Sequence, residues 1–201
     1  MPLPTRTLAL NILRAHRTSS DAEVLALALK TLASGQRYLA YELLRAAPRA
    51  LTAARVKDIR RFTVGMDTWS DVDCFGCFVA GVAWRTGRIS DKEIARLASS
   101  RDRWWRRAAL VATVPLNATS RGATSAAGDA RRTLAVCERL LEDRDDMVVK
   151  AMSWALRELA KRNPRAVRTF LSEQGARLTA RVRREVTNKL TTGRKSPRSR
   201  A

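Results

Sequence analysis

The chain has 201 residues, with 39 Lys and Arg against 19 Asp and Glu, which gives a formal net charge of +20 at pH 7. This excess of positive charge favours a polyanionic partner, nucleic acid before an anionic membrane surface. Hydrophobic residues make up 45% of the chain, a composition typical of a globular protein rather than a disordered one. The sequence has no apolar run long enough to span a bilayer and no signal-peptide pattern, so we expect a cytoplasmic protein.

Capping residues and apolar spacing predict short helices along the chain. Ser20 with Glu23, and Ser90 with Glu93, match the capping box, in which a hydroxyl and a carboxylate satisfy N–H groups at a helix start. Asn163–Pro164 matches an N-cap followed by proline at the first helical position. Further helices are expected over Thr5 to Arg17, Arg37 to Ala46, Ala53 to Val64, Asp71 to Thr86, Arg103 to Val114, Asp129 to Leu141, Asp145 to Lys161 and Thr179 to Leu190. No segment alternates apolar and polar residues, so we expect no strands.

Short helices joined by brief turns are typical of a helical repeat array, or α-solenoid. Such an array curves, and its concave face suits an extended ligand. We therefore expect an all-α superhelix with a concave basic groove, forming a single domain over residues 1–190. The breaker-rich segment Pro115 to Gly128 is expected to be the one long loop, and residues 191–201 a basic, disordered tail.

A tryptophan and a carboxylate occur together in Thr68 to Asp73 (TWSDVD), at a predicted helix start. Trp69 and Asp73 are four residues apart, a spacing that stacks them on one helix face. A carboxylate beside an indole suits a partner that is polyanionic as a whole and cationic where chemistry happens, as alkylated DNA is. The alternative interpretation is structural: Ser70 caps the helix, and Asp71 and Asp73 stabilise its positive end. Trp69 would then belong to the core.

The predicted helix Asp145 to Lys161 carries two stripes of side chains. An apolar stripe faces the core and consists of Val148, Met152, Ala155, Leu156 and Leu159. Roughly 200° around the helix lies a second stripe, which consists of Lys150, Trp154, Arg157 and Lys161. Basic residues interleaved with an aromatic side chain suit a phosphate track with a stacking platform. Packing of Trp154 between helices is the alternative.

Arg106 and Arg107 belong to a third cluster, which begins at Arg101 and contains Trp104. Arginine binds phosphate bidentately, and two adjacent arginines at a helix start can reach neighbouring phosphates. The alternative is a buried helix with Trp104 in the core and the arginines paired with acids.

The chain has three cysteines, and this odd number argues against a disulfide framework. Cys74 and Cys77 match C-x-x-C, which occurs in redox sites and zinc sites, but here the motif lies within a helical pattern. A closed zinc site needs four ligands, and only Cys137 and His16 remain as soft candidates. We expect buried, unreactive thiols and no metal.

The three clusters resemble, in order and approximate spacing, motifs of the AlkD-like DNA glycosylases of bacterial alkylation repair. The W-D-x-V-D motif of that family matches Trp69 to Asp73, W-x-R-R matches Trp104 to Arg107, and K-A-x-x-W-x-L-R-E matches Lys150 to Glu158. The resemblance extends from about Arg37 onward. Ser70 and Asp71 stand where the family has Asp and Thr, and the N-terminus is shorter, which leaves an inactive relative as an alternative.

The resemblance implies HEAT-like repeats and a catalytic role for Asp73. It also implies that Trp69 and Trp154 contact the lesion nucleotide and that Arg106 holds the DNA backbone. With the basic clusters, the expected backbone-binding residues are Arg106, Arg107, Lys150, Arg157 and Lys161. The implied activity is excision of cationic N3- or N7-alkylated purines from duplex DNA in base excision repair. We expect a nucleoid-associated monomer that needs no cofactor, and keep a non-catalytic scaffold for nucleic acid or protein as the rival hypothesis.

Overall fold

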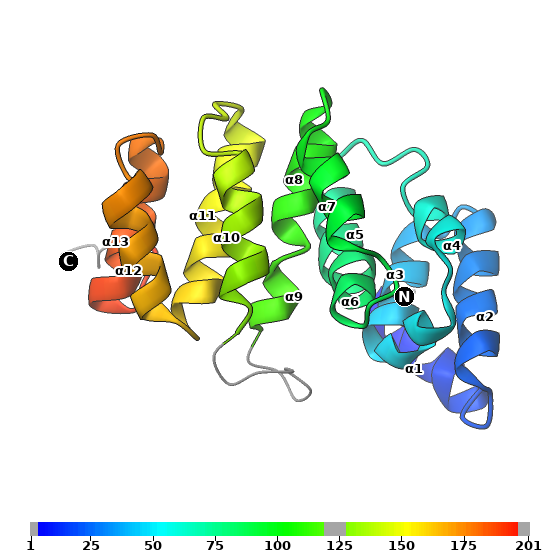
Figure 1. Ribbon diagram of the computed structural model, residues 1–201. Coiled ribbons are helices and arrows are strands. Elements are labelled where there is room, and N and C mark those ends of the chain that lie inside the picture. The colour runs from blue at the N-terminus through cyan, green and yellow to red at the C-terminus, as the bar shows by residue number, and fades with distance from the viewer. Residues whose placement is uncertain (1–3, 119–127, 197–201) are drawn as a thin grey trace. The chain divides into compact units, whose positions relative to one another are not determined.

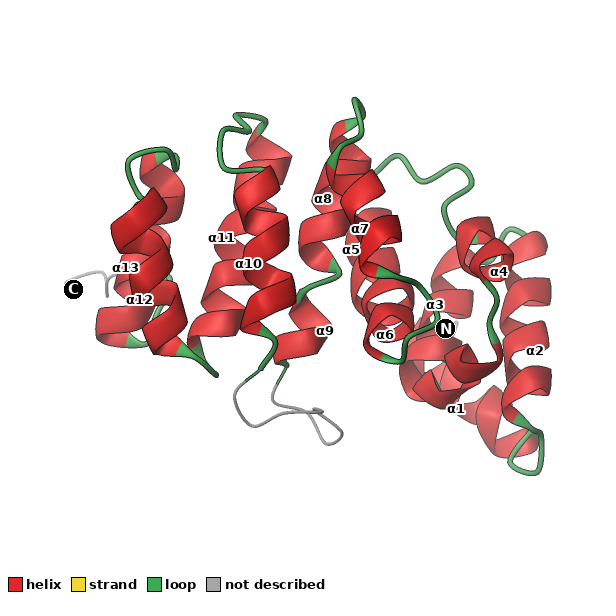
Figure 2. Ribbon diagram, in the orientation of Figure 1, coloured by secondary structure: helices red, strands yellow, loops and turns green. Residues whose placement is uncertain are grey.

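The computed structural model describes residues 4–118 and 128–196, which form helices and loops and no strand (Figure 1, Figure 2). The helices pack in a repeat-like arrangement, which confirms the all-α solenoid expected from the sequence. The chain divides into two compact units, Met1–Ser90 and Asp91–Ala201. A single domain over residues 1–190 and a concave groove stay predictions.

The first unit is built around α3, which packs against α1, α2, a 3₁₀ helix, α5 and a π-helical turn. Its elements are α1 (Thr5–Ala15), α2 (Asp21–Ala33), α3 (Arg37–Ala46), the 3₁₀ helix (Pro48–Ala53), α4 (Val56–Arg61), α5 (Trp69–Phe75), the π-helical turn (Gly76–Ala80) and α6 (Gly81–Arg85). The Ser20 capping box forms as predicted. One helix over Ala53 to Val64 was a wrong prediction, because the backbone is extended at Ala54 and Arg55.

The second unit is built around α11, which packs against α8, α9, α10, α12 and α13. Its elements are α7 (Asp91–Ala98), α8 (Arg103–Val111), α9 (Val114–Asn117), α10 (Ala130–Arg139), α11 (Asp146–Ala160), α12 (Pro164–Gln174) and α13 (Ala180–Thr192). The whole predicted apolar stripe of α11 is buried, which confirms it as the core face of this helix. The predicted N-cap Asn163 also forms, accepting from the Ala166 N–H at 3.0 Å.

The predicted loop Pro115 to Gly128 begins later than expected, because Pro115 to Asn117 are helical in α9. The buried Asn117 side chain donates to the Thr113 carbonyl and to Thr133 Oγ1, and accepts from the Asp129 N–H at 2.9 Å. These bonds tie α9 to the start of α10. The remainder of the predicted loop, residues 119–127, lies outside the described residues.

The first residues of the predicted disordered tail, 191 and 192, belong to a helix. α13 continues to Thr192, and Gly193 ends it with a left-handed φ of 73° that reverses the chain. The Asn188 side chain then donates to the Lys195 carbonyl at 3.2 Å. The segment that follows the helix is therefore held against α13 as far as Lys195. Residues 197–201 lie outside the described residues.

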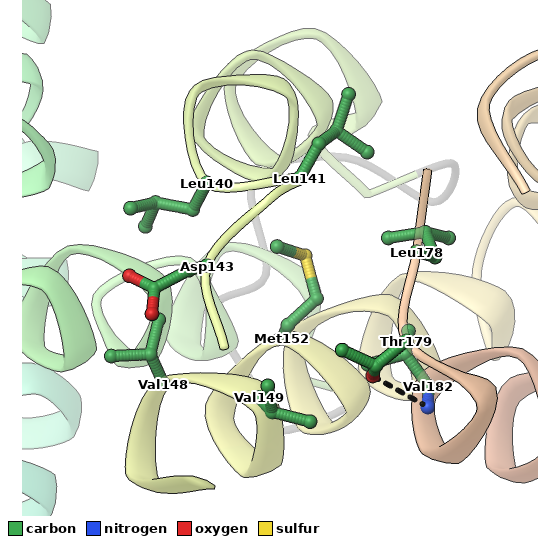
Figure 3. Close-up of a pocket in the computed structure, with 9 residues that line it drawn as sticks. All are labelled: Leu140, Leu141, Asp143, Val148, Val149, Met152, Leu178, Thr179 and Val182. Atoms are coloured by element: carbon green, nitrogen blue, oxygen red, sulfur yellow. Dashed lines mark hydrogen bonds between the residues drawn. The ribbon is translucent and has the colours of Figure 1, made fainter. Parts of the chain in front are cut away.

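A crevice between α11 and the loops that precede α11 and α13 is filled by its own side chains (Figure 3). Met152 points from α11 towards Leu140, Leu141 and Leu178, and the lining leaves no room for a water-sized molecule. A shallower groove of about 350 Å³ lies beside α10 and α12, between Leu134 and Phe170. The crevice is thus part of the core rather than a ligand pocket.

Leu156→Ala should lower the free energy of unfolding by about 2–5 kcal/mol, because it removes a side chain from the centre of a packed core. Leu156 is fully buried on α11, the helix that most of the second unit contacts. Leu10→Ala, at a position that is 39% exposed, is the control and should change this free energy far less. Chemical denaturation of both variants checks the difference, and equal losses would contradict the central place of α11.

Candidate functional site

The start of α5 is capped by Thr68, not by Ser70 as the structural interpretation of the sequence had it. The Thr68 hydroxyl accepts from the Asp71 N–H at 3.2 Å and donates to Asp71 Oδ2 at 2.7 Å. Asp71 is only 6% exposed, and its other oxygen lies 3.9 Å from Arg37 Nε. This carboxylate is therefore occupied in holding the helix start.

The loop before α5 is held by side chains of α3. Arg37 donates to the carbonyls of Phe62, at 3.2 Å, and Val64, and the buried Tyr41 hydroxyl donates to the Phe62 carbonyl at 3.1 Å. Burial raises the pKa of Tyr41 to about 12, so this hydroxyl keeps its proton and remains a donor at neutral pH. Gly65 has a φ of +67°, and a Cβ there would lie 3.2 Å from the Arg37 guanidinium. The sequence offered no signal for this role of Arg37 and Tyr41.

Trp69 and Asp73 differ from their capping neighbours in exposure. Trp69, the first residue of α5, is 57% exposed, so the interpretation of this side chain as core was wrong. Asp73 lies one helical turn further along and is half-buried. The structure therefore separates two acids that are close in sequence: Asp71 is inside the fold, and Asp73 is half-buried, one helical turn from an exposed indole.

Burial affects the thiols of Cys74 and Cys137. Cys74 and Cys77 are half-buried on α5 and the π-helical turn, and burial raises the pKa of Cys74 to about 11, with a further rise from Asp73. Cys137 is fully buried on α10, and burial raises its pKa as well. The thiols of Cys74 and Cys137 therefore stay protonated at neutral pH. Residues 4–118 and 128–196 contain no group of three or more His, Cys, Asp or Glu side chains that could hold a metal ion.

Arg106 and Arg107, on α8, are both engaged within the protein. Arg106 forms an ion pair with Asp143 at 2.6 Å and donates to the carbonyls of Ser100 and Arg101. Arg107 is only 6% exposed and donates to the Met147 carbonyl at 2.6 Å, at the start of α11. The expectation that Arg107 binds phosphate conflicts with the burial of this side chain, because a guanidinium must be at the surface to contact DNA.

The second stripe of α11 is more open than the first. Lys150 and Lys161 are exposed and pair with acids on their own helix, Asp146 at 2.6 Å and Glu158 at 2.7 Å. The pKa of Asp146 is lowered, chiefly by the Lys150 hydrogen bond. Trp154 is half-buried. This burial is intermediate between a fully exposed stacking platform and a side chain packed between helices, the two interpretations drawn from the sequence.

Arg157 completes the stripe and is held by a buried polar contact that the sequence analysis missed. Its Nε donates to Ser153 Oγ at 3.2 Å, and that hydroxyl donates to Glu185 Oε2 at 2.5 Å. Ser153 is fully buried, and Glu185 is 7% exposed. A signal was present, because an acid at Glu185 interrupts the apolar spacing of Val182 and Val186 in a basic helix.

Comparison with known proteins gives a family match over most of the chain. A family model described as "DNA alkylation repair enzyme" matches residues 4–190, a range that includes α5, α8 and α11. No curated protein matches the chain. No helix among the described residues is both long enough and apolar enough to cross a membrane.

Asp71→Ala should lower the free energy of unfolding by about 1–3 kcal/mol, because it leaves the Thr68 hydroxyl and the Arg37 guanidinium without their carboxylate partner. Asp67→Ala is the matched control, since Asp67 carries the same charge four residues earlier but is exposed. It should change the free energy by no more than about 0.5 kcal/mol. Thermal and urea denaturation measure both, and a neutral Asp71→Ala would contradict its holding role.

Proposed function

Because the chain belongs to the family of DNA alkylation repair enzymes, we propose that it is a monofunctional DNA glycosylase for cationic N3- and N7-alkylated purines. The family assignment supports a role in repair of alkylation damage, with DNA as the partner. 3-Methyladenine and 7-methylguanine are the proposed substrates, released from duplex DNA in base excision repair. The protein would act as a monomer on nucleoid DNA in the cytoplasm.

The observation that carries this proposal is the separation of Asp71 from Asp73. Asp71 is buried and bonded to Thr68, so its carboxylate is not available to a ligand. Asp73 is half-buried, one turn from an indole that is 57% exposed. An acid partly open to solvent, beside an indole, is what a transient sugar cation needs. We therefore assign Asp73 as the catalytic carboxylate and Trp69 as the side chain that contacts the lesion nucleotide.

The chemistry uses the charge that the lesion already carries. Alkylation of a purine ring nitrogen makes the base cationic and a good leaving group. As the N-glycosidic bond breaks, the sugar gains oxocarbenium character, which a fixed carboxylate stabilises electrostatically. Asp73 also orients a water molecule for attack at the anomeric carbon, by analogy with glycoside hydrolysis. The indole face of Trp69 attracts the delocalised positive charge.

The DNA backbone is proposed to bind cations of the second unit. Arg157, Lys150 and Lys161 project from the open stripe of α11, and Arg106 is 20% exposed in its side chain on α8. We leave Arg107 out of this set because it is buried. Ion pairs with acids on the same helix reduce the net charge that Lys150 and Lys161 present. Arg157 is therefore the strongest candidate for a phosphate contact.

The rival hypothesis is a non-catalytic scaffold that binds nucleic acid through the same cations. Its binding would depend on Arg157 and Lys150 but not on Asp73. Ser70 and Asp71, which differ from the family motif, keep this hypothesis in view. Release of methylated base from alkylated duplex DNA by the purified protein decides between the two.

Asp73→Asn should reduce release of 3-methyladenine by roughly 100- to 1000-fold, the loss seen when one fixed group that stabilises transition-state charge is removed. Affinity for duplex should stay the same or rise slightly, because an acid repels phosphate. Single-turnover base release and equilibrium binding to undamaged duplex measure the two effects.

Asp71→Asn is the matched control for that experiment. It removes a charge two residues away, from an acid that is inside the fold, and should lower thermal stability while reducing base release by less than about tenfold. If Asp73→Asn and the wild type release base at the same rate, a different acid is the catalytic group. If neither protein releases base, the scaffold hypothesis is supported.

The protein should release 3-methyladenine and 7-methylguanine but not uracil or hypoxanthine from matched duplexes. Neutral bases leave only when they are protonated or strongly hydrogen-bonded, and the single histidine, His16, lies on the C-terminal side of α1 rather than on α5. Side-by-side excision assays check this choice. Efficient uracil release without methylpurine release would contradict both the mechanism and the proposed substrates.

A further inference from the structure

A chain of polar contacts joins α11 to α13 beneath the open stripe of α11. The buried Glu185 carboxylate accepts from Ser153 through Oε2 at 2.5 Å. Its other oxygen, Oε1, lies 3.7 Å from Arg181 Nε and 3.6 Å from Lys195 Nζ. Lys195 belongs to the segment after Gly193, beyond the residues that the family model matches. The carboxylate is thus fixed by groups from α11, from α13 and from the segment that follows α13.

The direction of the hydrogen bonds is set by the carboxylate. The Ser153 hydroxyl donates its one proton to Glu185 Oε2. The lone pairs of that hydroxyl then face the Arg157 Nε–H, which donates at 3.2 Å. Glu185 therefore acts on Arg157 through Ser153, although the two charged groups form no direct ion pair among the described contacts.

The contact leaves the outer edge of the Arg157 guanidinium available. Among the described residues, no group bonds to its two terminal nitrogens, and neither nitrogen is among the buried unpaired atoms. Arg106 differs, because both its Nε and one terminal nitrogen are occupied by protein oxygens. An arginine held by Nε, with two terminal nitrogens that no described group occupies, has the donors for bidentate binding of a phosphate.

We propose that Ser153 and Glu185 are positioning residues that hold Arg157 for a phosphate of the DNA backbone. The proposal rests on the proposed function, since it takes DNA as the ligand of this face. It gives Glu185, a buried acid in the basic helix α13, a role in DNA binding. Without such a role, the negative charge of this residue would only weaken the attraction of the helix for a polyanion. Fixing the side chain in advance reduces the conformational entropy that Arg157 loses when it binds.

The first test is a double-mutant cycle on binding to undamaged duplex DNA. Arg157→Ala should weaken binding about tenfold and reduce the log–log salt slope by about 0.9, because one phosphate contact is lost. Ser153→Ala should weaken binding by about three- to tenfold in the wild-type background, by loss of a charge-assisted hydrogen bond. In the Arg157→Ala background it should weaken binding no further, because its effect passes through Arg157.

The second test uses the sign of a charge change. Glu185→Gln removes a negative charge from a cationic surface, which by long-range electrostatics alone would strengthen DNA binding. The proposal expects weaker binding instead, because the amide can donate to the Ser153 hydroxyl in competition with Arg157. Glu173→Gln is the control: Glu173 is exposed on α12, outside the polar chain, and its loss should leave binding unchanged or slightly stronger.

The outcomes are distinct from those that test the proposed function. Equal losses from Ser153→Ala in both backgrounds, at unchanged salt slope, would show a purely structural role and overturn the proposal. Tighter DNA binding by Glu185→Gln would also overturn the proposal. If a thermal melt shows that Ser153→Ala is not folded, Glu185→Gln serves as the test in its place. A wild type that binds duplex but releases no methylpurine would defeat the glycosylase function while leaving this cycle measurable; a wild type that binds no duplex overturns both.

Discussion

Arginine donors that bind backbone carbonyls hold the turns between helices, and the positions of the candidate site residues depend on these contacts. Arg37 and Arg106 each donate to two carbonyl groups, and Arg107 donates to the Met147 carbonyl. The carbonyls of Phe62, Val64, Ser100 and Arg101 lie in turns or loops, where the backbone supplies few donors of its own, and the carbonyl of Met147 lies in the first turn of α11. The loop that leads to Trp69 is fixed in this way from α3, so the exposed indole and the acid one turn later are placed by a residue distant in sequence.

This use of arginine changes how the net charge of +20 should be understood. A large positive charge attracts a polyanion from a distance, whichever residues carry it. Direct contact with phosphate, however, requires donors that the fold has not used. Arg107 adds to the field but is buried, whereas Arg157 keeps its terminal nitrogens open. The candidate DNA interface therefore contains fewer arginines than the net charge alone would suggest. Tertiary contacts decide which arginines belong to it.

The sequence was sufficient for the helical class, the core face of α11 and the family, because local periodicity and three short motifs carry that information. Predicted helix boundaries were less accurate where two neighbouring residues can both act as the N-cap. At the start of α5, Ser70 and Thr68 are both of a residue type that caps helices, and Thr68 is the one that does. The distinction between Asp71 and Asp73 also required the fold, since only the contact with Arg37 shows which acid is enclosed. Partners far apart in sequence, such as Ser153 and Glu185, have no local signature that pairs them.

The π-helical turn at Gly76–Ala80 joins α5, which begins with Trp69, to α6 in one continuous helical segment. A π turn contains one residue more than an α-helical turn, so the side chains before it are rotated by about 100° relative to a regular helix. Phe75, immediately before this turn, and Val79, within it, are both buried. Natural variants of this segment are thus expected to differ by substitution rather than by insertion or deletion. Loss of a single residue would restore a regular helix and turn the indole and its acid away from their present directions.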